Sequence, residues 1–452
     1  MHRPQFHIAL ICCALLWSLT ARPASAMEVA GELSGHTRWS GEVLLTQEVM
    51  VPAGARLEIA PGTRVRAATA ASVLRINGAL EVAGQAEAPV EFLTPHGWQG
   101  IVFERPDQPA RIRYARFSGA ATALTASGAE VQLEQVTFRE CRTAVKGLRE
   151  AHLRVRDSRF ENNQIGVDAE LKSRLTLQGC LFEGQAQAGA RVATGSHLKL
   201  SDCRFVGNGA GLVLQQKITG AITASRFLDN DRGLVGTRTG AGLEVRGNLF
   251  ENNRIALESE TFSQFALSDN RFVRNQTAVK SDQFATGEFL HNLFEGNRIA
   301  LKNTRRADPR VARNVFHGNE VAVYCDFSSY PRLHDNNFVE NPLAVKLGPF
   351  QSAAGARLPG AQRQEGMIGP GPGAALEFQA DSIQDFIDAS ANWWGMDTPQ
   401  LAAAGAEGNP SIFFDRRDQA EVELTDGAGG GLLDQVRFSP WLNAPVADAG
   451  PR

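Results

Sequence analysis

Apolar and polar residues alternate over short runs through most of this 452-residue chain. Runs such as Leu153-Arg154-Val155 and Leu243-Glu244-Val245 place every second side chain on one face, which is typical of β-strands with one buried side. Turns containing Asn or Gly separate these runs. Inside the repeats no segment shows the 3.6-residue stripe of an amphipathic helix. The pattern therefore predicts short strands joined by tight turns.

The runs recur with a period of 22 residues, which slips only to 21 or 23. Each period contains one phenylalanine: Phe117, Phe138, Phe160, Phe182, Phe205, Phe227, Phe250, Phe272, Phe294, Phe316 and Phe338. The third residue after Phe is Asn in eight of these periods, and the sixth is always Ala or Gly. A fixed period in the low twenties indicates a solenoid, in which each coil buries its apolar face against its neighbours.

Equivalent residues of stacked coils lie ~4.8 Å apart, so the phenylalanines should stack inside the solenoid. The Asn residues should form a ladder along a buried turn, because neighbouring amides can satisfy one another there. Five consecutive coils also place Asn two residues before Phe, from Asn248 to Asn336. Parallel crossovers are overwhelmingly right-handed. The sequence thus predicts an all-β, right-handed parallel β-helix of about 22-residue coils with N- and C-terminal caps.

The first residues have the pattern of a secretory signal peptide. Arg3 supplies the positive charge, Ile8–Leu19 is apolar, and Ala24-Ser25-Ala26 is a cleavage site. An apolar run of this length is too short to span a bilayer, so we expect cleavage and no membrane span in the mature chain. The expected divisions are a signal peptide at 1–26, an N-terminal cap and first irregular coils at 27–110, the regular β-helix at 111–347, a Gly/Ala/Pro-rich insertion at 348–391 and a closing segment at 392–452.

Cleavage would leave four cysteines: Cys141, Cys180, Cys203 and Cys325. Cys180 and Cys203 both lie two residues before Phe on adjacent coils. A spacing of ~4.8 Å between such positions fits the Cα range of a disulfide, which an oxidising compartment permits. The alternative is that both are small buried residues in the place of Asn. No CxxC spacing points to zinc or redox chemistry.

Several motifs carry a resemblance to a known family: Val51–Gly62, Trp98-Gln99-Gly100-Ile101, the Asn–Phe–Asn repeats and Asn392-Trp393-Trp394-Gly395. The chain resembles secreted bacterial right-handed parallel β-helix repeat proteins, which have the pectate lyase-like superfamily fold. That group includes lyases, hydrolases, epimerases and adhesins. The resemblance therefore implies the fold but no particular activity.

The sequence contains no recognisable catalytic motif. A lyase of this fold would resemble its relatives in clustering Asp for calcium beside an Arg or Lys base, and a hydrolase would need paired carboxylates from neighbouring coils. We find neither, and expect no catalytic residue, metal or cofactor. Asp residues three positions before Phe are followed two residues later by Arg, which predicts exposed ion pairs: Asp157 with Arg159, Asp202 with Arg204, and Asp269 with Arg271.

One column, eight residues after Phe, is a candidate binding site: Lys280, Lys302, Tyr324 and Lys346. If it faces outward, its ammonium groups extend along ~15 Å of the rod and could bind an acidic glycan or another anionic partner. The alternative is a solvated face that aids solubility. His291, His317 and His334 fall in different columns and are expected to be surface residues. The tryptophans of the closing segment should pack as a cap, although they could also stack on sugars.

These observations lead to one main hypothesis and two alternatives. A formal net charge of −3 and the lack of a basic arm give no indication of a nucleic-acid partner. The main hypothesis is a secreted, non-catalytic binding or scaffold protein, periplasmic or extracellular, with a polysaccharide or an envelope protein as partner. The alternatives are a carbohydrate-active enzyme, either a polysaccharide lyase or a glycoside hydrolase, and a subunit or accessory of an envelope complex. Carboxylates converging on one face would favour the enzyme.

Overall fold

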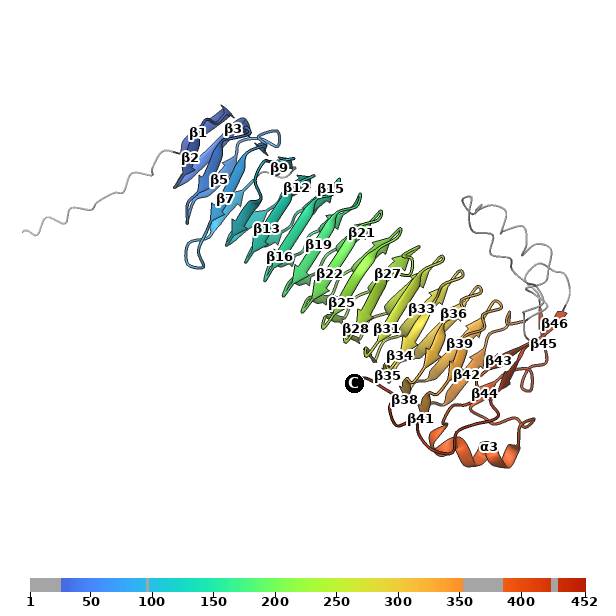
Figure 1. Ribbon diagram of the computed structural model, residues 1–452. Helices are drawn as coiled ribbons and strands as arrows, with labels where there is room; N and C mark the ends of the chain where they lie inside the picture. Colours follow the sequence, from blue (N-terminus) through green and yellow to red (C-terminus); the bar gives the residue numbers. More distant parts are fainter. Residues whose placement is uncertain (1–25, 95–96, 353–384, 424–429) are drawn as a thin grey trace, which may run out of the picture.

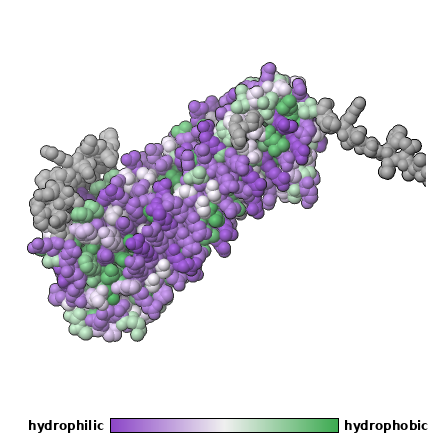
Figure 2. Space-filling model, turned by 180° about the vertical axis from the view of Figure 1, so that it is seen from behind, coloured by the Kyte–Doolittle hydropathy of each residue, from purple (hydrophilic) through white to green (hydrophobic). Residues whose placement is uncertain are grey.

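The computed structural model describes residues 26–94, 97–352, 385–423 and 430–452. These residues form an elongated rod of stacked coils that ends in a C-terminal cap (Figure 1). The face in Figure 2 is mostly hydrophilic along the rod. The described helices are the 3₁₀ helix η2 (Gly395–Asp397) and α3 (Thr398–Ala404). The expected all-β class is confirmed. No described helix is long and apolar enough to cross a membrane. The expected signal peptide falls almost wholly on residues 1–25, outside the described part.

Each regular coil contributes three strands, one to each side of the rod. The first side is a sheet of 14 parallel strands. They are β2 (His36–Trp39), β4 (Arg56–Ile59), β7 (Ala79–Ala83), β10 (Ala110–Arg113), β13 (Glu130–Glu134), β16 (His152–Arg156), β19 (Arg174–Gln178), β22 (His197–Ser201), β25 (Thr219–Thr223), β28 (Leu243–Arg246), β31 (Gln264–Ser268), β34 (Thr286–Leu290), β37 (Arg310–Ala312) and β40 (Arg332–His334).

The other two sides belong to one sheet of 29 strands. Its phenylalanine row contains β5 (Arg64–Ala67), β8 (Val90–Leu93), β11 (Ala115–Ser118), β14 (Thr137–Arg139), β17 (Arg159–Glu161), β20 (Leu181–Glu183), β23 (Arg204–Val206), β26 (Arg226–Leu228), β29 (Leu249–Glu251), β32 (Arg271–Val273), β35 (Leu293–Glu295), β38 (Val315–His317) and β41 (Asn337–Val339). Its other row contains β6 (Leu74–Ile76), β9 (Ile101–Glu104), β12 (Thr122–Ser127), β15 (Thr143–Leu148), β18 (Ile165–Ala169), β21 (Ala188–Ala193), β24 (Ala210–Gln215), β27 (Arg232–Thr237), β30 (Ile255–Glu260), β33 (Thr277–Asp282), β36 (Ile299–Thr304), β39 (Val321–Asp326), β42 (Leu343–Leu347) and β44 (Phe413–Phe414).

Strands β1 (Met27–Glu32) and β3 (Glu42–Val51) start this sheet, and β3 continues into both rows. The remaining described strands are β43 (Phe386–Asp388), β45 (Glu421–Glu423), β46 (Gly430–Leu432) and β47 (Gln435–Arg437). Within the described residues only β45 and β46 pair antiparallel. The chain is thus a right-handed parallel β-helix, as the repeat predicted.

The phenylalanines stack inside the rod as predicted. Neighbouring rings from Phe92 to Phe338 have centroids between 4.3 and 5.1 Å apart. Phe92 lies one coil before the first phenylalanine of the regular period, and Trp394 continues the stack 4.6 Å beyond Phe338. All these rings are buried. The phenylalanine period therefore explains the core and its closure rather than a surface site.

Two Asn ladders satisfy the buried turns on either side of each phenylalanine strand. In the ladder after Phe, Asn275 donates its backbone N–H and its Nδ2 to Oδ1 of Asn297, at 2.8 and 3.0 Å. The same Nδ2 also donates to the Phe250 carbonyl. In the ladder before Phe, Asn336 ends the series by donating its N–H to Oδ1 of Asn392 at 2.8 Å. The predicted ladders are confirmed, and the closing motif supplies their last rung.

The closing segment covers the open end of the core. Trp394 is fully buried, and Phe413 meets its ring edge-on at 5.1 Å. Phe386–Asp388 forms strand β43 beside β47, and its central residue, Ile387, is buried. Most of the expected insertion, residues 353–384, lies outside the described part of the chain.

Candidate functional site

The predicted lysine column exists as a row on one side of the rod. Strands β33, β36, β39 and β42 place Lys280, Lys302, Tyr324 and Lys346 in register. All four side chains are half-buried. Because the register is continuous, their spacing along the rod is that of adjacent strands, ~4.8 Å per coil.

The lysines of this row differ in their partners. Lys280 Nζ lies 2.7 Å from Glu258 Oε1, so its charge is neutralised. Lys302 Nζ lies 5.7 Å from the centroid of the Tyr324 ring, and Lys346 Nζ lies 5.6 Å from that of Phe414. In the described residues no carboxylate lies within 4.0 Å of Lys302 or Lys346. Two lysines of the row, Lys302 and Lys346, therefore lie over aromatic rings rather than beside carboxylates.

The hydroxyl of Tyr324 already has a partner. It donates to Asp326 Oδ2 at 2.9 Å, and the other Asp326 oxygen accepts the N–H groups of Phe327 and Phe350. Burial raises the pKa of Asp326, and burial together with the Asp326 charge raises that of Tyr324. The hydroxyl is therefore not free to bind a ligand. The ring of Tyr324 is the part that the row presents.

A cluster of carboxylates that the sequence did not predict lies at the N-terminal end of the row. Glu258 and Glu260 lie on β30, in register with Lys280 and Asp282 on β33. The side chains of Glu258 and Asp282 are only 5% and 2% exposed. Glu258 falls eight residues after Phe250, in the same column as the lysines. The same column, followed one coil further toward the N-terminus, identifies Glu258 but not Glu260 or Asp282, which lie ten residues after their Phe.

The environments of Glu260 and Asp282 differ. Burial and the neighbouring Glu258 charge raise the pKa of Glu260. Burial alone would raise the pKa of Asp282, but hydrogen bonds from Arg305 and Thr304 outweigh it and lower that pKa. Arg305 Nε donates to Asp282 Oδ1 at 2.6 Å, and Thr304 donates to the same oxygen at 2.8 Å. Two neighbouring carboxylates whose pKa values are shifted in opposite directions can serve as an acid and a base.

An aromatic stack on the outer turn beside this cluster was also missed. The Phe262 and Phe284 rings are stacked 5.2 Å apart, and the Arg306 guanidinium lies 5.7 Å from the Phe284 ring. Phe262 is 46% exposed. The 22-residue period did not predict this stack, because both residues lie outside the phenylalanine column.

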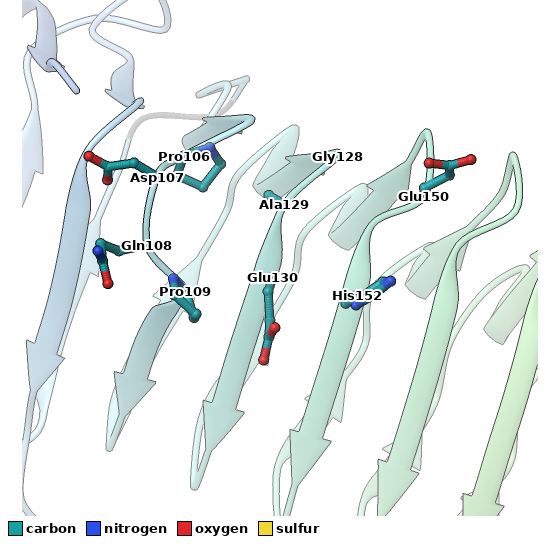
Figure 3. Close-up of a pocket in the computed structure, with 9 residues that line it drawn as sticks. All are labelled: Pro106, Asp107, Gln108, Pro109, Gly128, Ala129, Glu130, Glu150 and His152. Carbon is teal, nitrogen blue, oxygen red and sulfur yellow. The ribbon is translucent and has the colours of Figure 1, made fainter. Parts of the chain in front are cut away.

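A small hollow elsewhere on the rod contains acidic residues (Figure 3). It measures about 260 Å³ and lies between the Pro106–Pro109 loop, the start of strand β13 at Glu130 and the turn that carries Glu150. Asp107 Oδ2 accepts the Gly54 N–H at 2.9 Å, and Glu130 is paired with Arg154. Figure 3 shows Glu150 at the turn and His152 on the strand, extending in different directions. The hollow offers no converging set of free polar groups.

Cys180 and Cys203 lie on adjacent rungs of the ladder before Phe. Both thiols are free and buried, and each donates to the carbonyl two residues before it, at 3.4 Å for Cys180 and 3.2 Å for Cys203. The hydrogen bond with Cys180 and burial together raise the pKa of the Cys203 thiol. The placement agrees with the small buried residues that the sequence offered as the alternative. The disulfide stays a prediction.

The predicted Asp–Arg ion pairs are wrong. Within the described residues Asp157, Asp202 and Asp269 form no ion pair with the Arg two positions later, and Asp269 instead contacts Arg246 at 3.1 Å. Asp157 and Asp269 lie in turns and have a left-handed backbone conformation, with φ of 47° and 57°. The Arg residues begin the next strand. The turn between them removes the same-face placement that the spacing suggested.

Two family models match consecutive parts of the chain. Residues 99–250 match the model described as right handed beta helix region, and residues 243–349 match that described as periplasmic copper-binding protein (NosD). Solved structures of the periplasmic alginate epimerase AlgG and of its double mutant are similar in fold. Each has 12% identity over 68% of this chain and 75% of the other, with TM-scores of 0.33 and 0.37 respectively. No curated protein sequence matches the chain.

The described residues do not fit a copper site. They contain no group of three or more His, Cys, Asp or Glu side chains that could hold a metal ion. Within 243–349, His291 contacts the Asp448 carbonyl, and His317 lies between Glu295 and Glu340. Cys325 is fully buried. The imidazole and thiol ligands that copper prefers do not converge here, so we derive no step through a metal.

Proposed function

We propose that this right-handed parallel β-helix repeat protein is a non-catalytic binding protein of the periplasm that holds an acidic glycan along Lys302, Tyr324 and Lys346. The signal-peptide pattern and the description of the family model matched at 243–349 support the location. The three residues lie within that matched segment. The periodic core forms a rigid rod, and the row contributes the two ammonium groups and the aromatic ring that would contact the glycan.

The observation that carries the proposal is the pairing of each lysine with an aromatic ring rather than a carboxylate. Attraction to a ring face is worth about 0.5–2 kcal/mol and leaves the ammonium without a counter-ion, so its charge stays available for an anionic partner. A sugar acid offers a carboxylate for the ammonium and a C–H face for the ring. Lys302 and Lys346 are two coils apart, about 10 Å at the inter-strand spacing, which suits successive acidic groups on an extended chain.

Calorimetry with acidic and neutral oligosaccharides of equal length tests the proposal. Lys302→Gln combined with Lys346→Gln should weaken binding of the acidic oligosaccharide by on the order of tenfold or more, because two charge contacts are lost. Lys146→Gln is the matched control. It lies in the same column, but Lys146 Nζ is 3.6 Å from Glu170 Oε1 and its charge is already paired. Equal binding of the neutral oligosaccharide, or unchanged binding by the double variant, would refute the proposal.

A second candidate function is favoured by Glu260 and Asp282, which are register partners with opposed pKa shifts. A glycoside hydrolase or polysaccharide lyase could use Glu260, whose pKa is raised, as the acid and Asp282, whose pKa is lowered, as the base. Incubation with acidic polysaccharides, followed by measurement of new reducing ends or unsaturated products, tests this function. Activity should disappear in Glu260→Gln and Asp282→Asn. It should persist in Glu251→Gln, whose carboxylate is paired with Arg274 on the surface. If no acidic polysaccharide yields a product, the catalytic function is refuted and only the binding function remains.

A further inference from the structure

On the outer face of the 14-stranded sheet several Arg residues pair with a carboxylate of a neighbouring coil, although in the described chain Arg111 and Arg332 form no such pair. Arg56 pairs with Glu81, Arg154 with Glu130, and Arg310 with Glu288. Each pair joins residues from neighbouring strands of the sheet, so each Arg is neutralised by the coil before or after it. Each such pair offsets the repulsion between like charges at the inter-strand spacing.

On β16, β19 and β22, Arg154 is paired in this way, but in the described chain Arg156, Arg174 and Lys199 are not. The outward residues of these strands form a grid, in which His152 aligns with Arg174 and His197, Arg154 with Thr176 and Lys199, and Arg156 with Gln178 and Ser201. The grid contains no carboxylate and no apolar side chain. We call these nine outward residues of β16, β19 and β22 the cationic lattice.

Three cations of the lattice form no ion pair in the described chain, although Glu134 on β13 is in register with Arg156. Arg156, Arg174 and Lys199 are exposed, and in the described chain no Asp or Glu lies within 4.0 Å of them. The acidic residues that follow β16 and β22, Asp157 and Asp202, lie in the turns and form no ion pair with the lattice. Uncompensated cations on adjacent coils repel one another, and an anionic partner would remove that repulsion.

The other lattice residues indicate what kind of anion fits. Thr176, Gln178 and Ser201 place hydroxyl and amide groups between the cations, and His197 Nδ1 lies 3.0 Å from the Thr219 hydroxyl. A polymer with both acidic groups and hydroxyls can use both kinds of side chain. A lipid surface would favour large apolar residues among the cations, and the lattice has none. We propose that the cationic lattice is a second binding surface for an acidic polysaccharide.

The lattice and the lysine row lie on different sheets of the rod, since β16, β19 and β22 belong to the 14-stranded sheet and β36, β39 and β42 to the 29-stranded sheet. Six coils separate β19 from β37, the strand in the same coil as β39. The centres of the two surfaces are therefore about 29 Å apart along the rod at the inter-strand spacing. One polymer could occupy each surface. Cross-linking of two polymers rests on the proposed function of the lysine row, whereas binding at the lattice does not.

Calorimetry with a polyuronate at low salt tests the lattice with four proteins: the wild type, the lattice variant Arg156→Gln/Arg174→Gln/Lys199→Gln, the row variant Lys302→Gln/Lys346→Gln, and the two combined. Circular dichroism confirms that each is folded. The lattice variant should lose one class of sites and the combined variant all binding, and added salt should weaken what remains. Arg310→Gln, which removes a paired Arg from the same sheet, should bind like the wild type.

Light scattering of polyuronate mixed with each protein adds a second measurement. The wild type should cross-link the polymer, and neither the lattice variant nor the row variant should. Wild-type binding by the lattice variant would overturn the inference, whatever the row variant does. Unchanged binding by the row variant with weaker binding by the lattice variant would refute the lysine row and support the lattice. Binding to vesicles of phosphatidylglycerol but not to polyuronate would overturn the glycan as the ligand.

Discussion

Glu260 and Asp282 are register partners on adjacent coils, yet their surroundings move their pKa values in opposite directions. Asp282 accepts hydrogen bonds from Arg305 and Thr304, whereas Glu260 faces the charge of Glu258. Because a pKa change between folded and unfolded states makes stability depend on pH, the two carboxylates should contribute to stability with opposite sign.

The pH dependence follows from these directions. The folded pKa of Asp282 is lowered, so its contribution is present above the ordinary Asp pKa and is lost as the pH falls through the folded value. The folded pKa of Glu260 is raised, so stability falls as the pH rises from the ordinary Glu pKa through the folded value. At neutral pH we therefore expect Asp282→Asn to destabilise the protein and Glu260→Gln to stabilise it. Urea unfolding from about pH 3 to about pH 8 measures both effects.

In acid the two variants should approach the wild type, because both carboxylates are then protonated in the folded and unfolded states. Glu251→Gln is the control for removing a surface carboxylate paired with Arg274. A Glu260→Gln protein that is less stable than the wild type at neutral pH would contradict the prediction.

The Asn ladders should be costly to interrupt. Asn275→Ala removes the acceptor of the Asn253 N–H and Nδ2, at 2.9 and 3.0 Å, and also the donor to the Phe250 carbonyl. Because these groups stay buried, we expect a loss of about 2–4 kcal/mol in the free energy of unfolding. Chemical denaturation measures the loss. Gln276→Ala, at the exposed next residue, should change stability by less than about 0.5 kcal/mol. Equal effects of the two substitutions would show that the ladder adds little.

The inner and outer phenylalanine stacks should differ in their contribution. Phe250 is fully buried between Phe227 and Phe272, so Phe250→Ala leaves a cavity and should cost about 3–5 kcal/mol. Phe262 is stacked on Phe284 but exposed, and Phe262→Ala should cost less than about 1.5 kcal/mol. Denaturation midpoints of the two variants give the comparison. A larger loss for Phe262→Ala would mean that the outer turn, rather than the core, limits stability.

The fold was predictable because the same residue types recur at the same place in every coil. Phe250 and Asn275 each repeat a contact made a coil earlier, so a period in the sequence becomes a stack in space. The closing role of Trp394 was also predictable, since a large apolar residue after the last coil must cover an open core.

For the candidate site, the sequence could predict only which side chains lie in one column on successive coils. The column of Lys280 and Lys302 follows from the period, and the register confirms it. The partners of these lysines do not follow, because a ring such as Tyr324 and a carboxylate such as Glu258 can occupy the same column. Interactions across turns depend on local backbone conformation. The left-handed turn residue Asp157 accordingly broke the expected pairing with Arg159.

The last prediction concerns Cys180 and Cys203. Their neighbouring ladder positions bring the two strands to the inter-strand spacing of ~4.8 Å, within the Cα range of a disulfide. Both thiols are buried, so neither should react with iodoacetamide in the folded protein. When the protein has folded in an oxidising compartment and is then unfolded without reductant, we expect mass spectrometry to find alkylation of Cys141 and Cys325 alone. Addition of reductant before alkylation should make all four cysteines of the mature chain reactive.

Cys203→Ser provides the control. Serine already fills the next rung at Ser225, whose Oγ accepts the Cys203 N–H at 3.0 Å, so the variant should fold. Cys180 should then be alkylated without reductant, because its partner is gone. Alkylation of both cysteines in the oxidised, unreduced wild type would rule out the disulfide. The pair would then act only as small buried rungs, in the place that Asn248 and Asn270 fill further along the same ladder.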